Sequence, residues 1–349
     1  MAGVEDHLDN RLRQLPPRET HALITRVAEI DGFKGWWNGR GLTDAAARRQ
    51  LKSCIELAAS ASARIAGANG QPTPPPRGLA GQSQRAATAG YADLLRAVCA
   101  GYREMNLDVA LMVQCHSRML KYSHPDRHHR GRFRTIANPA PAAWRQERFV
   151  LRPADPDRIP QLLAAATDWV NVRLAAAEFH PLLVIASFIL EFLAIRPFAD
   201  GNGRLSRVLT TLLLLRCGYS YVPYAPLEAL IAERWAEYYF GLRQSQAGAR
   251  LPQPNITPWL HSFLEVLQLQ ARGLRNRYTD ARPHQRLSSN QLKVLDLFAI
   301  EEEITNRLVC QELSIPKDTA KQVLNRLLAL NLLARLGAGR AARYRRISA

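Results

Sequence analysis

The 349-residue sequence predicts a mainly α-helical protein with a small β-hairpin and a C-terminal winged helix-turn-helix. Apolar residues recur at helical spacing through most of the chain, which is the main evidence for helices. Clusters of proline and glycine separate the helical stretches from one another. Residues 332–347 instead alternate with a period of two around Gly337-Ala338-Gly339, as expected for a hairpin.

These patterns divide the chain into four regions. We expect an N-terminal helical region at 1–90, a helical core domain at 91–262, a helical linker at 263–285 and the winged helix-turn-helix at 286–349. Within the core, residues 131–152 contain prolines and short Phe-containing runs, which indicate a loop or hairpin. The clearest single helices are expected at Glu19–Ile30, Asp44–Ile65, Pro181–Ile195 and Thr257–Tyr278.

The composition limits the cellular environment and the classes of binding partner that we expect. The formal net charge of +17 favours nucleic acids or nucleotides over cations as partners, although an Arg- and Ala-rich composition alone also makes a chain basic. The longest apolar stretch, Pro181–Ile195, is shorter than the roughly 20 residues of a membrane span, so we expect no membrane partner. The chain opens without an apolar leader, and its five cysteines form no CxxC pair. We therefore expect free thiols and a cytoplasmic protein.

The most informative run, Pro197–Arg207, lies between the apolar stretch and a second helix. Its glycines allow the backbone to turn, so that several N–H groups and the N-terminus of the following helix point at one spot. Asp200 supplies the oxygen ligand that Mg²⁺ prefers, and Arg204 and Arg207 share one helical face. The run predicts a polyphosphate site, with a solvated helix face as the alternative for the arginine pair. The predicted nucleotide-binding residues are Asp200, Gly201, Asn202, Gly203, Arg204 and Arg207.

The same run resembles the signature of the Fic (Fido) family, His-Pro-Phe-x-[Asp/Glu]-Gly-Asn-Gly-Arg-x-x-Arg, at every position except the first. The resemblance implies a helical Fic core of the protein adenylyltransferase type, which moves AMP from ATP onto a hydroxyl of a target protein. It also implies that Asp200 holds Mg²⁺, that Asn202 contacts the α-phosphate region, and that the two arginines contact the β- and γ-phosphates. Residues 32–37 and the C-terminal region resemble a bacterial subgroup with a winged-helix tail.

Arg196 stands where the family has its catalytic histidine. A general base must be neutral near pH 7, which suits histidine with its unperturbed pKa of about 6.5. A guanidinium has no acceptor and stays protonated. Loss of a general base removes about 10²–10⁴-fold of rate, so we expect nucleotide binding with weak or absent AMP transfer, as in a pseudoenzyme. Either the histidine at this position was replaced without a new role for the arginine, or Arg196 has acquired a contact with phosphate. His116 is an alternative candidate for the base. His180 is not, because it lies about 24 Å from Arg196 along a continuous helix.

Two further segments resemble functional parts of the family. Ser62–Gly67 resembles the inhibitory helix, [Ser/Thr]-x-x-x-Glu-[Gly/Asn], with Ser62 and Gly67 matching. Ala66 replaces the glutamate that would pair with Arg207, so we expect no autoinhibition by this helix. Residues 130–134 resemble the start of the flap, a hairpin that holds the target chain by strand addition. The residues implied at the flap are Gly131, Phe133 and Arg134.

The C-terminal region carries a basic surface that suits a DNA duplex. In a winged helix-turn-helix the third helix enters the major groove, and basic side chains on it and on the wing neutralise phosphates. The candidate DNA-binding residues are Lys317, Lys321, Arg326, Arg340 and Arg343. A winged helix used only for protein contacts or dimerisation is the alternative, and the sequence leaves a homodimer open. The whole chain is then either an AMP-transferase-type protein or a nucleotide-responsive DNA-binding regulator with a Fic core as sensor.

Overall fold

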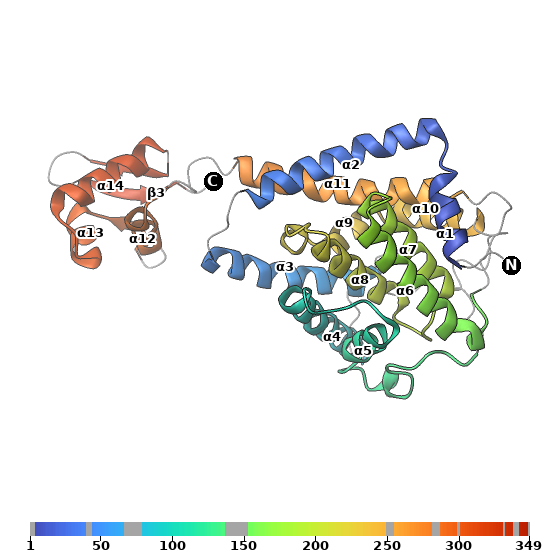
Figure 1. Cartoon of the computed structure of the whole chain (residues 1–349). Helices are drawn as coiled ribbons and strands as arrows, with labels where there is room; N and C mark the ends of the chain where they lie inside the picture. Colours follow the sequence, from blue (N-terminus) through green and yellow to red (C-terminus); the bar gives the residue numbers. More distant parts are fainter. Residues whose placement is uncertain are drawn as a thin grey trace. The chain divides into compact units, whose positions relative to one another are not determined.

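A computed structural model describes residues 4–39, 44–65, 79–136, 153–248, 255–280, 287–298, 301–330, 332–337 and 342–347. The fold is mainly α, as predicted, and helices make up most of the described part (Figure 1). The chain forms two compact units, Met1–Arg275 and Asn276–Ala349. No helix in the described part of the chain is both long and apolar enough to cross a bilayer.

The first unit is a stack of helices in which the predicted spans appear with small shifts. Its helices are α1 (Val4–Arg13), α2 (Pro17–Asn38), α3 (Asp44–Ile65), α4 (Leu79–Gly101), α5 (Val109–Met119), α6 (Ile159–Ala176), α7 (Pro181–Ile195), α8 (Asn202–Arg216), α9 (Leu227–Glu233), α10 (Trp235–Gly248) and α11 (Thr257–Asp280). The spans 44–65 and 181–195 are confirmed residue for residue, whereas α2 extends past its expected end at Ile30. Helix α2 continues because Phe33 and Trp37 repeat its buried face for two more turns.

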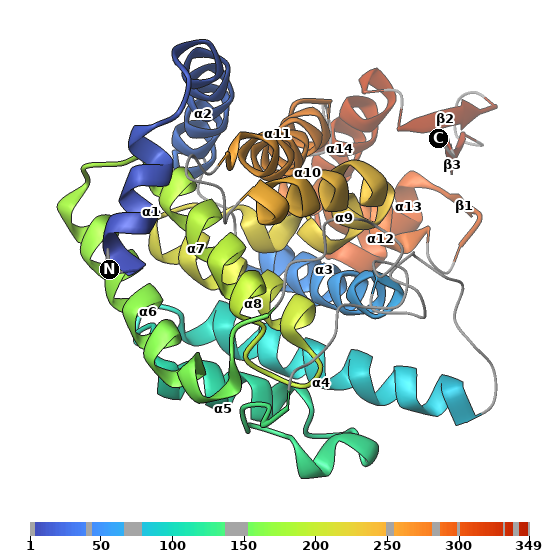
Figure 2. The same cartoon turned by 90° about the vertical axis from the view of Figure 1, so that its right-hand side faces the viewer.

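Helices α7 and α8 form the centre of the first unit. Helix α7 packs between α6 and α8, and α8 also contacts α4 and α5 (Figure 2). Most side chains of α8 are buried, and these include Arg204 and Arg207, at 7% and 4% exposure. The alternative of a solvated helix face for the arginine pair is therefore wrong. Two guanidinium groups inside a helical core need polar partners, since an unpaired buried charge is costly.

Local capping explains where these central helices begin and end. His180 accepts a hydrogen bond from the backbone N–H of Leu182 at 3.3 Å, and Pro181 occupies the first position of α7. The helix ends at Arg196, whose φ of 49° is left-handed. Gly201, with a φ of 80°, then starts α8. The chain thus reverses direction within six residues, and the two arginines of α8 follow directly.

The predicted flap is described only at its beginning. Phe133 forms an isolated antiparallel bridge with Phe198, and the N–H of Arg134 donates to the carbonyl of Pro197 at 3.0 Å. Residues 137–152, where the rest of the hairpin is expected, lie outside the described residues. The described start of the flap is therefore joined to residues 197–198 by a single bridge and one backbone hydrogen bond.

The second unit contains three helices and a three-stranded antiparallel sheet in the order β1-β3-β2. Its elements are α12 (Ser289–Leu297), β1 (Glu303–Ile304), α13 (Asn306–Leu313), α14 (Lys317–Ala329), β2 (Leu333–Leu336) and β3 (Arg343–Arg346). They enclose an apolar cluster of their own, which includes Val309, Leu324 and Tyr344. Ser288, and not Ser289, caps α12, because it forms a capping box with Gln291. Strand β1 was not expected, since two residues are too short for a pattern.

Candidate functional site

The motif loop, residues 196–201, is held from inside by Asn202. Its side-chain oxygen accepts the N–H of Phe198 at 3.0 Å, and its amide nitrogen donates to the carbonyl of Phe198 at 2.7 Å. Both polar atoms therefore hold the loop, and the expected contact of Asn202 with an α-phosphate stays a prediction. Because Gly201 offers no side-chain cap, the first N–H groups of α8 face the loop without a side-chain acceptor from that position.

Asp200 and Arg204 form an ion pair at the mouth of this loop. Arg204 Nη2 lies 2.6 Å from Asp200 Oδ2, and the aspartate side chain is 65% exposed. Burial would raise the pKa of Asp200, but Arg204, the N–H of Gly201 and the two nearby histidines together hold the pKa below its usual value. The carboxylate is thus ionised at neutral pH and accessible from solvent.

This single carboxylate suits a magnesium ion that arrives with its phosphates. Among the described residues no group of three His, Cys, Asp or Glu side chains is arranged to hold a metal ion. Mg²⁺ commonly binds through one or two carboxylates plus substrate phosphate oxygens and water, so Asp200 alone is a sufficient protein ligand of that kind. The donor set fits a metal–nucleotide complex better than a resident ion.

Arg207 lies deeper, with one end of its guanidinium held by helix α3. Its Nη2 donates to the hydroxyl of Ser62 at 2.7 Å and to the carbonyl of Ser62 at 3.3 Å. Its Nε is buried and has no hydrogen-bond partner. Ser62 is the first position of the predicted inhibitory helix, whereas Ala66 and Gly67 lie outside the described residues. An orphaned buried donor on a cation is the kind of group that an anionic ligand would satisfy.

Arg196 occupies the motif's first position with a left-handed backbone and a partly buried side chain. Its Nε is also buried without a partner. Burial and the neighbouring Arg134 cation lower the pKa of Arg196, against the attraction of Asp200. The site therefore gathers four arginines, and only one of them is ion-paired with the exposed aspartate.

The side chain of Arg134 donates its hydrogen bonds to backbone carbonyls of the protein itself. Its Nε donates to the carbonyl of Arg196 at 2.7 Å and its Nη2 to the carbonyl of Ile195 at 3.2 Å, while Nη1 bonds the carbonyl of Ile136. The side chain is 4% exposed. It thus binds the last carbonyls of α7, as basic side chains do at helix C-termini, and is not free to meet a target protein.

His116 is not a free base. Its Nδ1 accepts the N–H of Gly131 at 3.0 Å, so Nε2 carries the proton, and Nε2 lies 3.0 Å from the carbonyl of Asp200. The ring stacks on Phe198 with centroids 3.8 Å apart. Burial lowers the pKa of His116 to about 4. The histidine joins the start of the flap to the motif loop, and the substitute-base alternative is not supported because both ring nitrogens are engaged.

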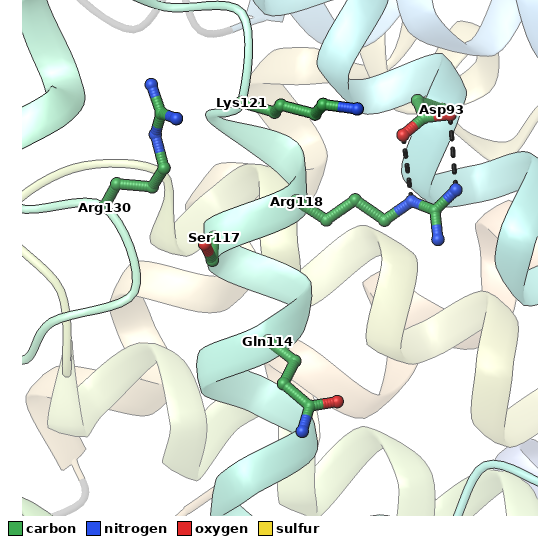
Figure 3. Close-up of a pocket in the computed structure, with 6 residues that line it drawn as sticks. All are labelled: Asp93, Gln114, Ser117, Arg118, Lys121 and Arg130. Carbon is green, nitrogen blue, oxygen red and sulfur yellow. Dashed lines mark hydrogen bonds and ion pairs between the residues drawn. The ribbon is translucent and has the colours of Figure 1, made fainter.

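A cavity of about 480 Å³ lies on the opposite, exposed face of α5 (Figure 3). It is lined by Asp93, Gln114, Ser117, Arg118, Lys121 and Arg130. Two of its three cations already have protein partners. Arg118 makes hydrogen bonds of 2.9 and 3.3 Å to Asp93, and Arg130 donates to the carbonyl of Ser123. None of these lining residues belongs to the motif loop, and of the three cations only Arg118 is paired with the carboxylate of the cavity.

Comparison with known proteins agrees with this geometry. Residues 106–214, which contain α5, α6, α7 and most of α8, match the Fic/DOC family. The chain carries a Fic domain. The chain is 32% identical over 100 residues to the protein adenylyltransferase fic-1 of Caenorhabditis briggsae, a match covering 29% of this chain and 18% of that protein. It is 39% identical over 67 residues to the protein adenylyltransferase Fic of Aedes aegypti, covering 19% and 13%. The chain thus spans less than a fifth of the length of these curated relatives.

Solved structures show that the fold is shared beyond the Fic domain. A Fic family protein from Desulfovibrio desulfuricans G20 superposes with a TM-score of 0.64 and 22% identity, covering 96% of this chain and 98% of that one. Fic-1 of C. elegans, residues 134–508, gives a TM-score of 0.56 and 18% identity, covering 76% and 74%. At these identities the likeness concerns fold alone.

Sequence reasoning missed two polar residues near the site. Tyr91 on α4 and Glu228 on α9 are buried beside Ser62, and the hydroxyl of Tyr91 donates to Glu228 Oε1 at 2.5 Å. Neither belongs to a motif, and the two lie 137 residues apart along the chain. No sequence pattern links such residues.

Proposed function

We propose that the Fic domain binds Mg-ATP at the N-terminus of α8, and that AMP transfer to a target hydroxyl is weak or absent. The observation that supports binding is the convergence of Asp200, Arg204 and the orphaned Nε of Arg207 on the uncapped start of one helix. The relatives named protein adenylyltransferases support AMP transfer as the chemistry of this site. Asp200 would hold the Mg²⁺, and the two arginines would hold phosphate oxygens.

The missing step is removal of a proton from the target hydroxyl. Arg196 has no acceptor and cannot take that proton. His116 cannot substitute for it, because Nδ1 already accepts the Gly131 N–H and Nε2 is protonated toward Asp200. The chain retains groups that attract phosphate, and it lacks a base at the position where the Fic signature places one.

Binding is tested by thermal stabilisation, since a ligand that binds the native state raises the melting temperature. We expect Mg-ATP to stabilise the protein, and Arg207→Ala or Asp200→Asn to reduce the shift strongly. Arg272→Ala is the control, because Arg272 is an exposed arginine paired with Glu29 on the far helices α11 and α2. Removal of Mg²⁺ with EDTA should reduce the shift in melting temperature that ATP causes in the wild-type protein. An unchanged shift in the Arg207 and Asp200 variants would contradict the proposal that these residues bind Mg-ATP.

Transfer is tested by incubating the protein and Arg196→His with Mg²⁺ and α-labelled ATP, with and without cell extract. We expect label on protein bands only with the histidine variant, because histidine restores a neutral base in the motif position. Labelling by the unaltered chain would show that another group supplies the base.

We expect a target protein, where one is bound, to lie along the flap. The bridge between Phe133 and Phe198 places the start of the flap against the motif loop, which supports a target strand added there. Phe133→Pro would weaken labelling of a target in the histidine background, since proline cannot donate to a strand pair. Self-labelling and Mg-ATP stabilisation should persist in that variant.

The second candidate function is DNA binding by the unit Asn276–Ala349. Three helices followed by an antiparallel pair, with Lys317, Lys321 and Arg326 exposed on or beside α14, support a winged helix-turn-helix. Arg343 is exposed but shares Glu303 with Arg345, at 3.5 and 2.6 Å, so the strand contributes less free charge than expected. Arg340 lies outside the described residues.

Fluorescence anisotropy of a labelled duplex tests this function. With about four phosphate contacts, affinity should fall on the order of 100-fold between 50 and 200 mM salt. The double variant Lys321→Glu, Arg326→Glu should bind much more weakly, whereas Lys52→Glu, an exposed lysine on α3, should retain most binding. Equal affinity of all three proteins would exclude α14 as the DNA contact.

A further inference from the structure

Arg207 stands at one end of a row of buried polar side chains that come from four helices. Its Nη2 donates to the Ser62 hydroxyl at 2.7 Å, Ser62 neighbours Tyr91, and the Tyr91 hydroxyl donates to Glu228 Oε1 at 2.5 Å. The four side chains come from α8, α3, α4 and α9. Their exposures are 4%, 0%, 1% and 2%, so water does not substitute for any of these bonds.

The direction of each bond follows from the number of protons available. The one hydroxyl proton of Tyr91 goes to Glu228, which leaves the Tyr91 oxygen as an acceptor towards Ser62. The Ser62 oxygen in turn accepts from Arg207, which is always a donor. Both hydrogen bonds therefore point the same way, from the guanidinium towards the carboxyl group. Aligned bonds of this kind polarise and strengthen one another in a dry interior.

We propose that Tyr91 and Glu228 are positioning residues for Arg207, which they hold through Ser62 so that its free edge faces the phosphates of a bound nucleotide. The proposal rests on the proposed function, because it assigns a phosphate contact to Arg207. One end of the guanidinium is fixed on Ser62 while Nε has no partner, which leaves that edge available to an anion. Glu228 supplies a carboxyl group for the buried cation, although burial raises the pKa of Glu228.

This arrangement also explains what the carboxyl group contributes without touching the ligand. A carboxylate in direct contact with Arg207 would compete with phosphate for its donors. Two intervening hydroxyls keep the carboxyl group at a distance, so that it orients the guanidinium and leaves donors unoccupied. Groups that orient a ligand-binding side chain in this manner typically change affinity by about 10–100-fold when removed from metal sites, and we expect the lower end of that range here.

The experiment measures the Kd of Mg-ATP by calorimetry for Tyr91→Phe and Glu228→Gln, each in the wild-type and the Arg207→Ala background. Tyr91→Phe removes the hydroxyl group, Glu228→Gln replaces the carboxyl group by an uncharged amide, and both leave the side-chain shape almost unchanged. In the wild-type background, each should weaken Mg-ATP about tenfold. In the Arg207→Ala background, neither should have a further effect, because the two residues act only through Arg207. A general loosening of the core would weaken binding in both backgrounds.

Tyr221→Phe is the matched control, because Tyr221 also has a fully buried hydroxyl but one with no hydrogen-bond partner. Its Mg-ATP affinity should equal that of the wild-type protein. An unchanged Kd in the Tyr91 and Glu228 variants, or an equal loss with and without Arg207, would overturn the positioning role and leave the nucleotide site intact. Absence of Mg-ATP binding by the wild-type protein would instead overturn the proposed function and the positioning role with it.

Discussion

At the scale of single residues, two buried polar side chains shape the motif loop. His116 joins the N–H of Gly131 to the carbonyl of Asp200, and Arg134 joins the end of α7 to the flap. Each satisfies several backbone groups that would otherwise be buried without partners, a deficit that costs about 1–3 kcal/mol per group. The loop is therefore held by residues outside the motif as well as by Asn202 within it, and the motif supplies the groups that we propose for phosphate binding.

The low pKa of His116 predicts a pH-dependent stability. Its pKa is about 4 in the folded protein and about 6.5 when unfolded, so between these values only the unfolded state binds the proton. The contribution of His116 to the free energy of unfolding should therefore rise by about 3 kcal/mol as the pH increases through this window. The same contribution should be lost as the pH falls. Urea denaturation at pH 7 and pH 4.5 should show a smaller loss for His116→Gln than for the wild-type protein.

The exposed His21 provides the control for this measurement. His21→Gln should lose as much stability on acidification as the wild-type protein, because its side chain faces solvent on α2. An equal loss in the wild-type, His21 and His116 proteins would contradict the assigned role of the buried ring.

At the scale of elements, the crossing of α4 and α5 determines where His116 lies. The two helices pack closely at Gly90, where an added Cβ would stand 1.9 Å from the carbonyl oxygen of Met119. Met119 ends α5, and its side chain also closes on Gly201, where a Cβ would lie 2.8 Å from the Met119 methyl carbon. Two glycines thus allow α4, α5 and the motif loop to meet without a gap.

Gly90→Ala should therefore destabilise the protein by about 1–3 kcal/mol, the usual cost of overpacking, despite the better helix propensity of alanine. The backbone carbonyl of Met119 cannot move aside as a flexible side chain would. Gly32→Ala in α2 is the matched control, since nothing lies within 4 Å of an added Cβ, and it should stabilise by up to about 1 kcal/mol. Urea denaturation measures both changes. Equal behaviour of the two variants would show that α4 and α5 pack less closely than described.

Element boundaries were predictable where local chemistry sets them. The span 181–195 followed from its apolar run between Pro181 and the motif. Ser288 and Thr305 are residue types that favour the N-cap, and each accepts a backbone N–H at the start of its helix. The burial of α8 on all sides was not predictable. The spacing of Arg204 and Arg207 predicts a shared polar face. In the structure Arg204 is paired with Asp200 just before the helix, whereas the partner of Arg207 is Ser62 on the neighbouring helix α3.

At the scale of the whole molecule, the chain contains two units with separate cores. The second unit closes its own apolar cluster around Leu324 and Tyr344. All six tryptophans lie before residue 276, at positions 36, 37, 144, 169, 235 and 259. Tryptophan fluorescence therefore reports on the first unit alone, whereas circular dichroism reports on the helices of both.

This distribution predicts two separable unfolding steps. Circular dichroism should show two transitions on heating, and tryptophan fluorescence should follow one of them. Mg-ATP should raise the midpoint of the fluorescence transition and leave the other unchanged, because the proposed nucleotide site belongs to the unit Met1–Arg275. Duplex DNA should act on the other transition if the second unit binds it. A single coincident transition by both probes would show that the units unfold together.

The sequence by itself determined the helical class, the motif Pro197–Arg207 and the arginine that precedes it at position 196, because these depend on residues close together in the chain. Only the tertiary structure decided which groups hold that motif in place. Ser62 meets Arg207 across 145 residues, Glu228 meets Tyr91 across 137, and His116 meets Asp200 across 84. Such contacts arise from packing of helices against one another, and periodicity along a helix identifies its buried face without identifying the partner that covers it.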